Sequence, residues 1–480
     1  MSNLNPDITL MDHQLVTRDF LARQQVAFDH SDPGTGKTFA AIAANEKRFL
    51  GKTLVLAPLS ILKPSWAADI KTLTNKDAVV AHGSPKKRTE AMNANADYVV
   101  MNHDGVNWLA DNTALLVNFQ TIIVDEFTAF KNRNAKRTKA LQLVSGYFQR
   151  KWFLSGTPAP NSVTDLWAPT FILDSGSRLG RSFYKFQSQV CTPSAVPGAP
   201  LGALKWTDKP DATLMVADMI KDISVRHLAK DCLDLPENRT STYYIDLPTK
   251  TRKEYEAFKK DRVFVHFKDM VASQMSGARP KAAISSVNAA AMVRKLIQIL
   301  TGSAYDGDGN VVKVHSERYN LVMDLVDQRS HSLVAFNYTH ERDALIALAK
   351  SKSRNISHAY IDGSVSLAKR NQIVDDFQAG KYKMLLVHPQ STAHGLTLTK
   401  GEAVIWTTGV YSTEQYLQTN KRIDRKGQTK ETETIRIIAR DTVEEEVYAK
   451  LDGKLDRVED LLGLLWANSQ SKNPLKGKAA

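Results

Sequence analysis

The sequence predicts an α/β protein with two doubly wound parallel-sheet lobes and a mostly helical insertion between them. Short apolar runs rich in β-branched residues alternate with helical patterns in two separate stretches of the chain, which is typical of parallel βαβ units. The chain has 480 residues, which is too long for one compact core, so two or three domains are expected.

The first alternating stretch predicts a lobe over residues 1–247. Its expected strands are the apolar runs at 26–28, 53–57, 98–101, 121–124, 152–154 and 242–245. Helical patterns separate them, for example at 66–73 and 135–144. The alternation stops near residue 175, where Ser, Gly and Pro become frequent. We therefore expect an irregular insertion at about 175–222.

The second alternating stretch predicts a lobe over residues 315–462, preceded by a helical insertion or linker at 248–314. Its expected strands are the runs at 332–336, 358–361, 384–387, 403–406 and 434–438. Expected helices include 367–378 and 413–424. Residues 463–480 are expected to form a basic, flexible tail.

Composition narrows the class of protein. Hydrophobic residues make up 42% and charged residues 24%, which is ordinary for a globular protein. No apolar stretch is long enough to cross a bilayer, and the N-terminus lacks the basic and apolar regions of a signal peptide. We expect no membrane partner and a cytoplasmic location, in a bacterium or a phage-infected cell. Cys191 and Cys232 lack metal-ligand spacing and are expected as free thiols.

The charge of the chain favours a polyanionic partner. The formal net charge is +13. Five cations fall within nine residues that contain no acid: Lys131, Arg133, Lys136, Arg137 and Lys139. A second basic cluster is 86–88. Each cluster fits either a track for phosphates or a solvated helix face.

A Gly-rich turn at residues 31–38 has the form of a phosphate-binding loop. It reads Ser31, Asp32, Pro33, Gly34, Thr35, Gly36, Lys37 and Thr38. An apolar run precedes it and a helical pattern follows, which is the context that such a loop needs. Backbone N–H groups and Lys37 would hold phosphates, and the Thr38 hydroxyl could ligate Mg²⁺. Ser31 departs from the usual Gly or Ala.

Two acids follow another apolar run. Asp125 and Glu126 come at the carboxyl end of an expected buried strand, where they would face the same crevice as the loop. The first could hold Mg²⁺, and the second could orient or deprotonate an attacking water. The turn 155–158 after the next run could sense the γ-phosphate.

Four further positions become candidate nucleotide contacts in a chain that has such a loop. Gln14 has an amide that could pair with the adenine edge. Gln418, Arg422 and Arg425 have spacings that put them on one face of an expected helix. The two arginines are either surface ion-pair partners or arginine fingers.

In their order along the chain, these motifs resemble those of superfamily-two helicases, and among them the Swi/Snf-type translocases on double-stranded DNA. The resemblance runs from about Met11 to Leu462. Other segments that carry it are Leu56–Ser60 with Trp66, Lys131–Asn132, Leu154–Asn161, Arg294–Gln298, Tyr360–Ser364, Ser391–Leu398 and Thr442–Glu445.

The resemblance implies two RecA-like lobes with ATP and Mg²⁺ as cofactors in the cleft between them. It implies nucleotide contacts at Gln14, Asp32 to Thr38 and Gly395, and hydrolysis by Lys37, Asp125, Glu126, Gln418, Arg422 and Arg425. It also implies DNA contacts, for which the candidates are Ser60, Lys131, Asn132, Arg133, Asn161, Ser391 and Thr392.

The chain departs from the family pattern at two places. Phe127 and Thr128 end the motif that starts at Asp125, where the family often has Ser or Ala and then His. His394 and Gly395 stand where paired glycines are usual. Without bromodomain, chromodomain or zinc-module sequences, the chain looks more like compact phage and bacterial enzymes than a nucleosome remodeller.

The expected function is an ATP-driven motor on duplex DNA that remodels forked or branched DNA in replication, recombination or repair. Alternatives are a strand-separating helicase, the motor of a restriction or defence complex, and a non-catalytic DNA-binding accessory protein. We expect a monomer, with replication or recombination proteins as candidate partners.

Overall fold

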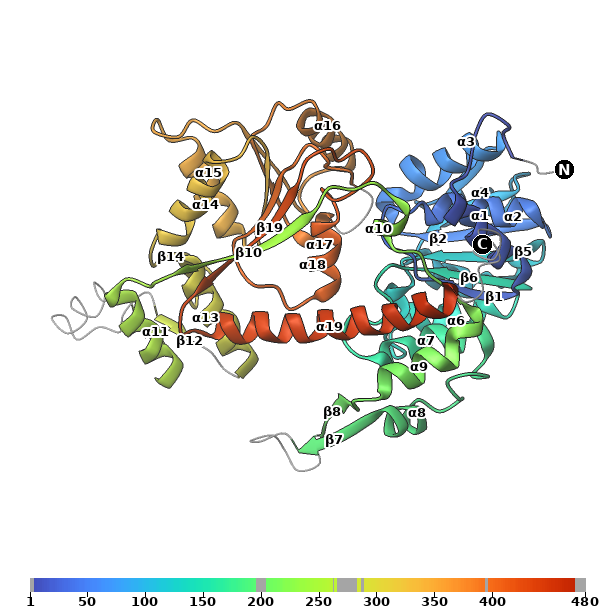
Figure 1. Ribbon diagram of the computed structural model, residues 1–480, viewed down its shortest axis with the longest axis horizontal. Helices are drawn as coiled ribbons and strands as arrows, with labels where there is room; N and C mark the ends of the chain where they lie inside the picture. The colour runs from blue at the N-terminus through green and yellow to red at the C-terminus, as the bar shows by residue number, and fades with distance from the viewer. Residues whose placement is uncertain are drawn as a thin grey trace, which may run out of the picture. The chain divides into compact units, whose positions relative to one another are not determined.

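The computed structural model describes residues 4–195, 204–261, 263–265, 283–285, 289–392 and 396–470. The chain divides into two compact units (Figure 1). The first comprises Met1–Asp234 and Lys454–Ala480, and the second comprises Leu235–Gly453.

The first unit is built on a seven-stranded sheet in the order β3-β4-β2-β5-β6-β1-β9. All of its neighbouring strands are parallel. The strands are β1 (Val26–Asp29), β2 (Lys52–Ala57), β3 (Ala78–Ala81), β4 (Tyr98–Asn102), β5 (Phe119–Asp125), β6 (Arg150–Leu154) and β9 (Ser224–Val225). This confirms the doubly wound parallel sheet and adds two strands that the sequence did not predict, β3 and β9.

Helices cover both faces of this sheet. The α-helices are α1 (Asp12–Arg23), α2 (Lys37–Lys47), α3 (Ala68–Thr74), α4 (Pro85–Asn93), α5 (Gly105–Ala110), α6 (Lys136–Ser145), α7 (Trp167–Asp174), α8 (Phe183–Val190), α9 (Ala212–Ile220) and α10 (Ala229–Cys232). Short helical turns of other types are η1 (Leu59–Ile61), η2 (Leu62–Ala67), η3 (Thr113–Leu116), η4 (Phe127–Phe130), η5 (Val163–Leu166) and η6 (Lys221–Ile223).

Alternate strand residues enter two separate cores. Ile122 and Val124 of β5 pack in one core with residues of α6, α7 and α9, whereas Ile123 packs in the other with residues of α1, α2 and α3. Figure 1 shows these two groups of helices on opposite sides of the sheet. Since both faces are buried, the strands read as continuous apolar runs.

The insertion expected to be irregular contains regular structure. Besides α8 and α9, it holds an antiparallel ribbon of β7 (Cys191–Ala195) and β8 (Leu204–Asp208). The prolines and glycines in and between the two strands are turn and loop signals, so the sequence pattern did not predict this pairing.

The second unit is built on a six-stranded parallel sheet in the order β10-β19-β18-β15-β17-β16. The strands are β10 (Asn238–Ile245), β15 (Ser332–Ala335), β16 (His358–Ile361), β17 (Met384–Val387), β18 (Ala403–Trp406) and β19 (Thr432–Ala439). The strand at 242–245, which we expected to end the first lobe, therefore belongs to this sheet, where β10 pairs with β19 over its whole length. A strand pattern does not state which sheet the strand joins.

The remaining elements complete the second unit. They are α11 (Thr249–Asp261), β11 (Val263–Val265), β12 (Ala283–Ser285), α13 (Ala289–Thr301), β13 (Ser303–Tyr305), β14 (Val311–Lys313), α14 (Glu317–Asp327), α15 (Thr339–Ala349), α16 (Leu367–Gln378), α17 (Pro389–Thr392) and α18 (Thr413–Asn420). The last helix, α19 (Val443–Gln470), begins in this unit, and its residues from Lys454 on belong to the first unit. The expected helical insertion thus also contains two short antiparallel pairs, β11 with β12 and β13 with β14.

Two helix ends differ from the expectation. The helix α18 stops at Asn420 rather than 424. The helix α19 extends to Gln470, so the first part of the expected tail is helical and the rest lies outside the described residues. Among the residues that the structure describes, no helix is long and apolar enough to cross a membrane.

Candidate functional site

The Gly-rich turn lies between β1 and α2, as a phosphate-binding loop requires. Gly34 and Gly36 have φ of +90° and +80°, a left-handed conformation that favours glycine. Lys37 is the first residue of α2, and its Nζ donates to the carbonyl oxygens of Ser31 (2.8 Å) and Asp32 (3.2 Å). The ammonium group therefore lies over the loop. Thr38 follows it in the first turn of the helix, where backbone N–H groups favour an anion.

Residues 226–229, which the sequence analysis did not single out, bind the loop through an ion pair and backbone hydrogen bonds. Asp32 forms an ion pair with Arg226 (3.0 Å), and its other carboxylate oxygen accepts a hydrogen bond from Ala229 N (3.0 Å). Ser31 Oγ accepts from His227 N (3.0 Å). Ser31, which departs from the usual loop pattern, thus makes a structural contact. Its partner lies 196 residues away, and no pattern near Ser31 in the sequence predicted it.

Gln14 connects α1 to the same loop. Its Nε2 donates to Thr35 O (3.2 Å) and its Oε1 accepts from Met11 N (3.0 Å). A Cβ on Gly36 would lie 2.1 Å from Gln14 Nε2, so the amide packs directly against the loop. Each amide atom keeps one further hydrogen-bonding capacity, which is the capacity that an adenine contact would use. Pro33, the remaining loop residue, is half-buried and faces Gly156.

Asp125 is held at the carboxyl end of β5 by groups on both sides. Its Oδ2 accepts from the Trp66 indole Nε1 (2.9 Å), its Oδ1 accepts from Glu126 N (3.0 Å), and its carbonyl oxygen contacts His103 Nε2 (2.8 Å). Burial and the neighbouring Glu126 carboxylate raise the pKa of Asp125 to about 6, against the opposing influence of Trp66 and Lys37. A buried carboxylate near an ammonium group is a suitable metal ligand.

A second buried acid lies in the same neighbourhood. Burial, with a smaller contribution from the Asp125 carboxylate, raises the pKa of Asp69, on α3, to about 6, while a hydrogen bond from Ser65 opposes the rise. No motif or spacing in the sequence singled out Asp69.

Glu126 adopts a left-handed conformation, with φ of +51°, which is unusual for a residue with a side chain. Its Oε2 accepts a hydrogen bond from Ser155 Oγ (3.2 Å), and the same hydroxyl accepts from Thr157 N (3.2 Å). The turn expected to sense the γ-phosphate is therefore bonded to the acid expected to handle the attacking water.

In the second unit, Arg422 and Arg425 do not lie on the helix that we expected to contain them, because α18 ends at Asn420. Lys421 N bonds back to Leu417 O and Thr419 O where α18 ends, so Arg422 and Arg425 lie in the following turn while Gln418 stays on α18. Arg422 is buried and donates to Leu396 O (3.3 Å), and Arg425 Nε donates to Lys421 O (2.8 Å). Gly395 lies outside the described residues.

Gln418 is buried, and neither its Oε1 nor its Nε2 has a hydrogen-bond partner among the residues that the structure describes. An unsatisfied buried amide is costly. A ligand that bonds to this amide would lower that cost.

The DNA-contact candidates of the first unit lie in several loops and turns. Ser60 is in η1 and Asn161 is exposed after β6, where its Nδ2 donates to Asp165 (3.1 Å). Lys131, Asn132 and Arg133 lie in the connection between η4 and α6. Arg133 is distinctive because its guanidinium stacks on Phe183 and Tyr184, at 4.3 and 4.8 Å from the ring centroids.

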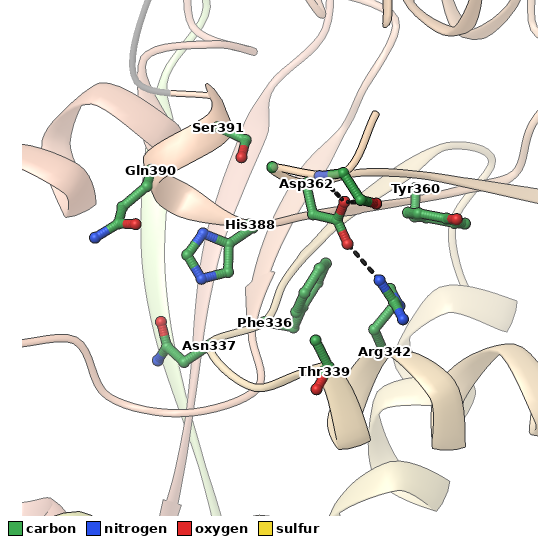
Figure 2. A pocket seen from close by; sticks show the side chains of 11 residues that line it. Phe336, Asn337, Thr339, Arg342, Tyr360, Asp362, His388, Gln390 and Ser391 are labelled. Atoms are coloured by element: carbon green, nitrogen blue, oxygen red, sulfur yellow. Dashed lines mark hydrogen bonds and ion pairs between the residues drawn. The ribbon is translucent and has the colours of Figure 1, made fainter. Parts of the chain in front are cut away.

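The DNA-contact candidate Ser391 lines a pocket of about 530 Å³ in the second unit. Figure 2 shows Arg342 joined to Asp362 by an ion pair, with His388, Asn337 and Gln390 around the same space. Arg342 also stacks on Tyr360 at 4.8 Å, and burial lowers the pKa of His388. The side chain of Thr392, the last residue of α17, lies outside the description.

The residues of the first unit fit ATP and Mg²⁺. The loop has left-handed glycines where a side chain would crowd a phosphate, an ammonium group, and a hydroxyl at the helix start. The ligand set of Thr38 and Asp125 consists of oxygens, as Mg²⁺ prefers. The structure brings together Lys37, Asp125 and Glu126 through the electrostatic interaction of Lys37 and Glu126 with Asp125.

Comparison with known proteins agrees with these features. The family model described as SNF2-related domain matches residues 29–298, and that described as helicase conserved C-terminal domain matches residues 317–427. The chain is 30% identical over 458 residues to protein p41 of Acyrthosiphon pisum secondary endosymbiont phage 1, covering 89% of this chain and 92% of that protein.

More distant relatives are longer than this chain. YwqA of Bacillus subtilis, which carries the name ATP-dependent helicase/translocase, is 25% identical over 88% of this chain but only 45% of its own length. Among solved structures, the Sulfolobus solfataricus SWI2/SNF2 ATPase core in complex with dsDNA has a TM-score of 0.43 and 20% identity, covering 99% of this chain and 98% of that one. This last likeness is too loose to carry weight. The SNF2-related model, which matches more than half of the chain, and the phage relative show that the chain belongs to the SNF2-related family of ATP-dependent helicases and translocases, which act on DNA.

Proposed function

We propose that the chain uses ATP to move along duplex DNA and to remodel forked or branched DNA in replication, recombination or repair. The observation that supports an active motor most strongly is the bond between Glu126 and Ser155. It joins the acid proposed for hydrolysis to the segment that carries Asn161, a candidate DNA contact. An inactive DNA clamp would have no use for such a connection.

In this proposal the first unit binds and orients the nucleotide. Lys37 and the N–H groups of the loop hold the phosphates, Gln14 contacts the adenine, and Glu126 orients and deprotonates the attacking water. Thr38 and Asp125 would hold Mg²⁺, which supplies charge neutralisation at the phosphates when bound. Arg422 and Arg425 are proposed to stabilise charge on the transferring phosphoryl group, with Gln418 beside them in sequence.

The proposed grip on DNA is electrostatic and independent of sequence. Its candidate contacts are cations, hydroxyls and amides, which suit the phosphate backbone and carry no base information. We expect affinity to fall steeply as salt rises, because bound phosphates release counterions. Affinity that does not respond to salt would contradict this account.

The decisive experiment compares ATP hydrolysis on single-stranded, duplex, forked and four-way DNA, for the natural chain and for Lys37→Ala. Duplex or branched DNA should stimulate the natural chain, and Lys37→Ala should remove the stimulated rate. A wild-type rate in that variant would refute the assignment of the loop.

Strand separation is the competing activity. Displacement of a third strand from a triplex, without unwinding of a plain duplex, is expected of a duplex translocase. Unwinding without triplex displacement would favour the strand-separating helicase instead.

We propose that the protein acts as a monomer in the cytoplasm of a bacterial or phage-infected cell. Sedimentation with and without DNA would test the oligomeric state.

A further inference from the structure

The ribbon of β7 and β8, with α8 at its base, has exposed surfaces that the proposed motor does not use. Figure 1 shows the two strands extending away from the rest of the first unit. All the described ribbon residues between Cys191 and Asp208 are exposed on both faces. A two-stranded ribbon without a covering layer needs another partner to bury an apolar face.

Register divides the ribbon into two chemically different faces. Pro193 pairs with Trp206 and Ala195 with Leu204, and paired residues lie on the same face of an antiparallel ribbon. One face is therefore apolar, with Leu204 52% and Trp206 36% exposed. The other face carries Thr192, Ser194, Lys205 and Thr207.

The surroundings of the ribbon are strongly basic. Residues 175–207 and 127–164 contain no Asp or Glu. The stacking of Arg133 on Phe183 and Tyr184 joins these two acid-free segments in space. Within the described chain, no carboxylate is paired with Lys136, Lys139, Arg181, Lys185 or Lys205. Beside the ribbon, Arg181 and Lys185 also line a pocket of about 310 Å³ with Ser182 and Gln189.

The base of the ribbon is fastened to the catalytic segment. The Asp208 carboxylate accepts hydrogen bonds from Ser162 Oγ (2.6 Å) and Val163 N (3.2 Å). These residues follow Asn161 in the segment whose Ser155 bonds Glu126. A contact made by the ribbon is therefore mechanically connected to the acid proposed for hydrolysis.

We propose that this arm, the described residues 181–195 and 204–208, binds DNA at a junction, where unstacked bases are exposed next to phosphates. The cations at the base of the arm hold the phosphates, and Trp206 stacks on an exposed base face. Aromatic stacking next to a cationic track is how proteins hold unpaired bases, and the lack of acids fits a polyanion rather than a second protein. The inference rests on the proposed function and names the DNA structure that the motor prefers.

The test measures the affinity for a forked DNA and for a blunt duplex of equal length by fluorescence anisotropy. Trp206→Ala should weaken fork binding by about tenfold or more and leave duplex binding unchanged, since one stacked base is lost. Trp206→Phe should restore most of the affinity. Tyr147→Ala removes an aromatic ring of the same unit that is 49% exposed and serves as the matched control, with no expected effect. Arg181→Ala with Lys185→Ala should weaken binding to both DNAs and reduce the salt slope by about 2.

Fork affinity of Trp206→Ala equal to that of the natural chain would overturn the proposal. If that variant instead changed the oligomeric state in sedimentation, the apolar face would be a protein-docking surface, which also overturns it. An equal loss on both DNAs without rescue by Trp206→Phe would mean that Trp206 only supports the fold of the arm. If no DNA stimulated ATP hydrolysis by the natural chain, the proposed function itself would fail. If DNA stimulated ATP hydrolysis but the arm variants bound DNA like the natural chain, only the proposal for the arm would be refuted.

Discussion

If Asp125 holds Mg²⁺ as proposed, the indole of Trp66 should set how well it does so, and one substitution isolates that contact. Trp66 is fully buried, and its Nε1 donates to Asp125 Oδ2 at 2.9 Å. Trp66→Phe keeps an aromatic ring in the core and removes only the donor and part of the ring. The carboxylate oxygen then loses a bond that fixes its direction.

The expected loss can be estimated from the type of bond. A hydrogen bond to a charged group contributes about 1.5–3 kcal/mol, which corresponds to a factor of about 10–150 in an equilibrium constant. We therefore expect the Mg²⁺ concentration for half-maximal ATP hydrolysis to rise by about tenfold or more. Burial and the Glu126 carboxylate raise the pKa of Asp125 to about 6, and the indole opposes that rise. Without the indole the pKa should rise further, so raising the pH above 7 should recover part of the lost activity.

The assay is DNA-stimulated ATP hydrolysis over a Mg²⁺ series at pH 7 and pH 8.5. Trp152→Phe is the matched control, because Trp152 is also fully buried in the same core and its Nε1 donates to Gln24 O (3.1 Å), away from the acids. An unchanged Mg²⁺ requirement in Trp66→Phe, or an equal rise in Trp152→Phe, would refute the reasoning.

Three further predictions concern hydrolysis and stability. Glu126→Gln should lower ATP hydrolysis by about 10²–10⁴-fold while ATP binding, measured by calorimetry, persists; loss of binding as well would contradict a role confined to the water. Burial and the positive charges of Arg226 and Lys37 lower the pKa of His30 to about 3, so the imidazole stays neutral in the folded state while it takes a proton near pH 6.5 when unfolded. The stability that it contributes is complete above pH 6.5 and is lost at about 1.4 kcal/mol per pH unit as the pH falls toward 3. His30→Phe should therefore flatten the fall in the free energy of urea unfolding between pH 7 and 5. Equal slopes of that free energy against pH in the variant and the natural chain would exclude His30 as the cause. The ion pair of Arg318 with Glu444 is fully buried, at 2.5 Å, so Arg318→Ala should lower the free energy of unfolding by about 3–5 kcal/mol. The control Arg329→Ala breaks a partly exposed pair with Glu433 and should cost about 1 kcal/mol or less. Similar losses in the two variants would contradict the role of burial.

Local patterns were sufficient for most strands of the two large parallel sheets and for the nucleotide loop. Strands such as β2 and β5 are buried on both faces, so their apolar runs were visible without any knowledge of partners. The loop at 31–38 was visible because its function fixes residue types at fixed spacing. Both signals are contained within a few neighbouring residues, which is why sequence reasoning found them.

Contacts between distant residues were not visible. Nothing near Ser31 indicates that His227 bonds to its hydroxyl, and nothing near Trp66 indicates that its indole reaches Asp125. The ends of helices are also decided by their surroundings: the spacing of Gln418 and Arg422 fits one helix, yet α18 ends between them at Asn420. The same holds for β10, whose partner β19 lies almost 200 residues further along the chain.

The contacts that join the arm to Glu126 also limit how strongly DNA there can influence hydrolysis. The connection from Asp208 through Ser162 to the segment of Ser155 depends on a few hydrogen bonds, each with a net contribution of about 1 kcal/mol. A ligand shifts an equilibrium only by its difference in affinity for the two states. Since this path can store about 1–3 kcal/mol, binding at the arm can change the population of a hydrolysis-competent Glu126 by about 5–150-fold. A larger stimulation by DNA would therefore require contacts beyond the arm, in the second unit or at Lys131 and Asn161.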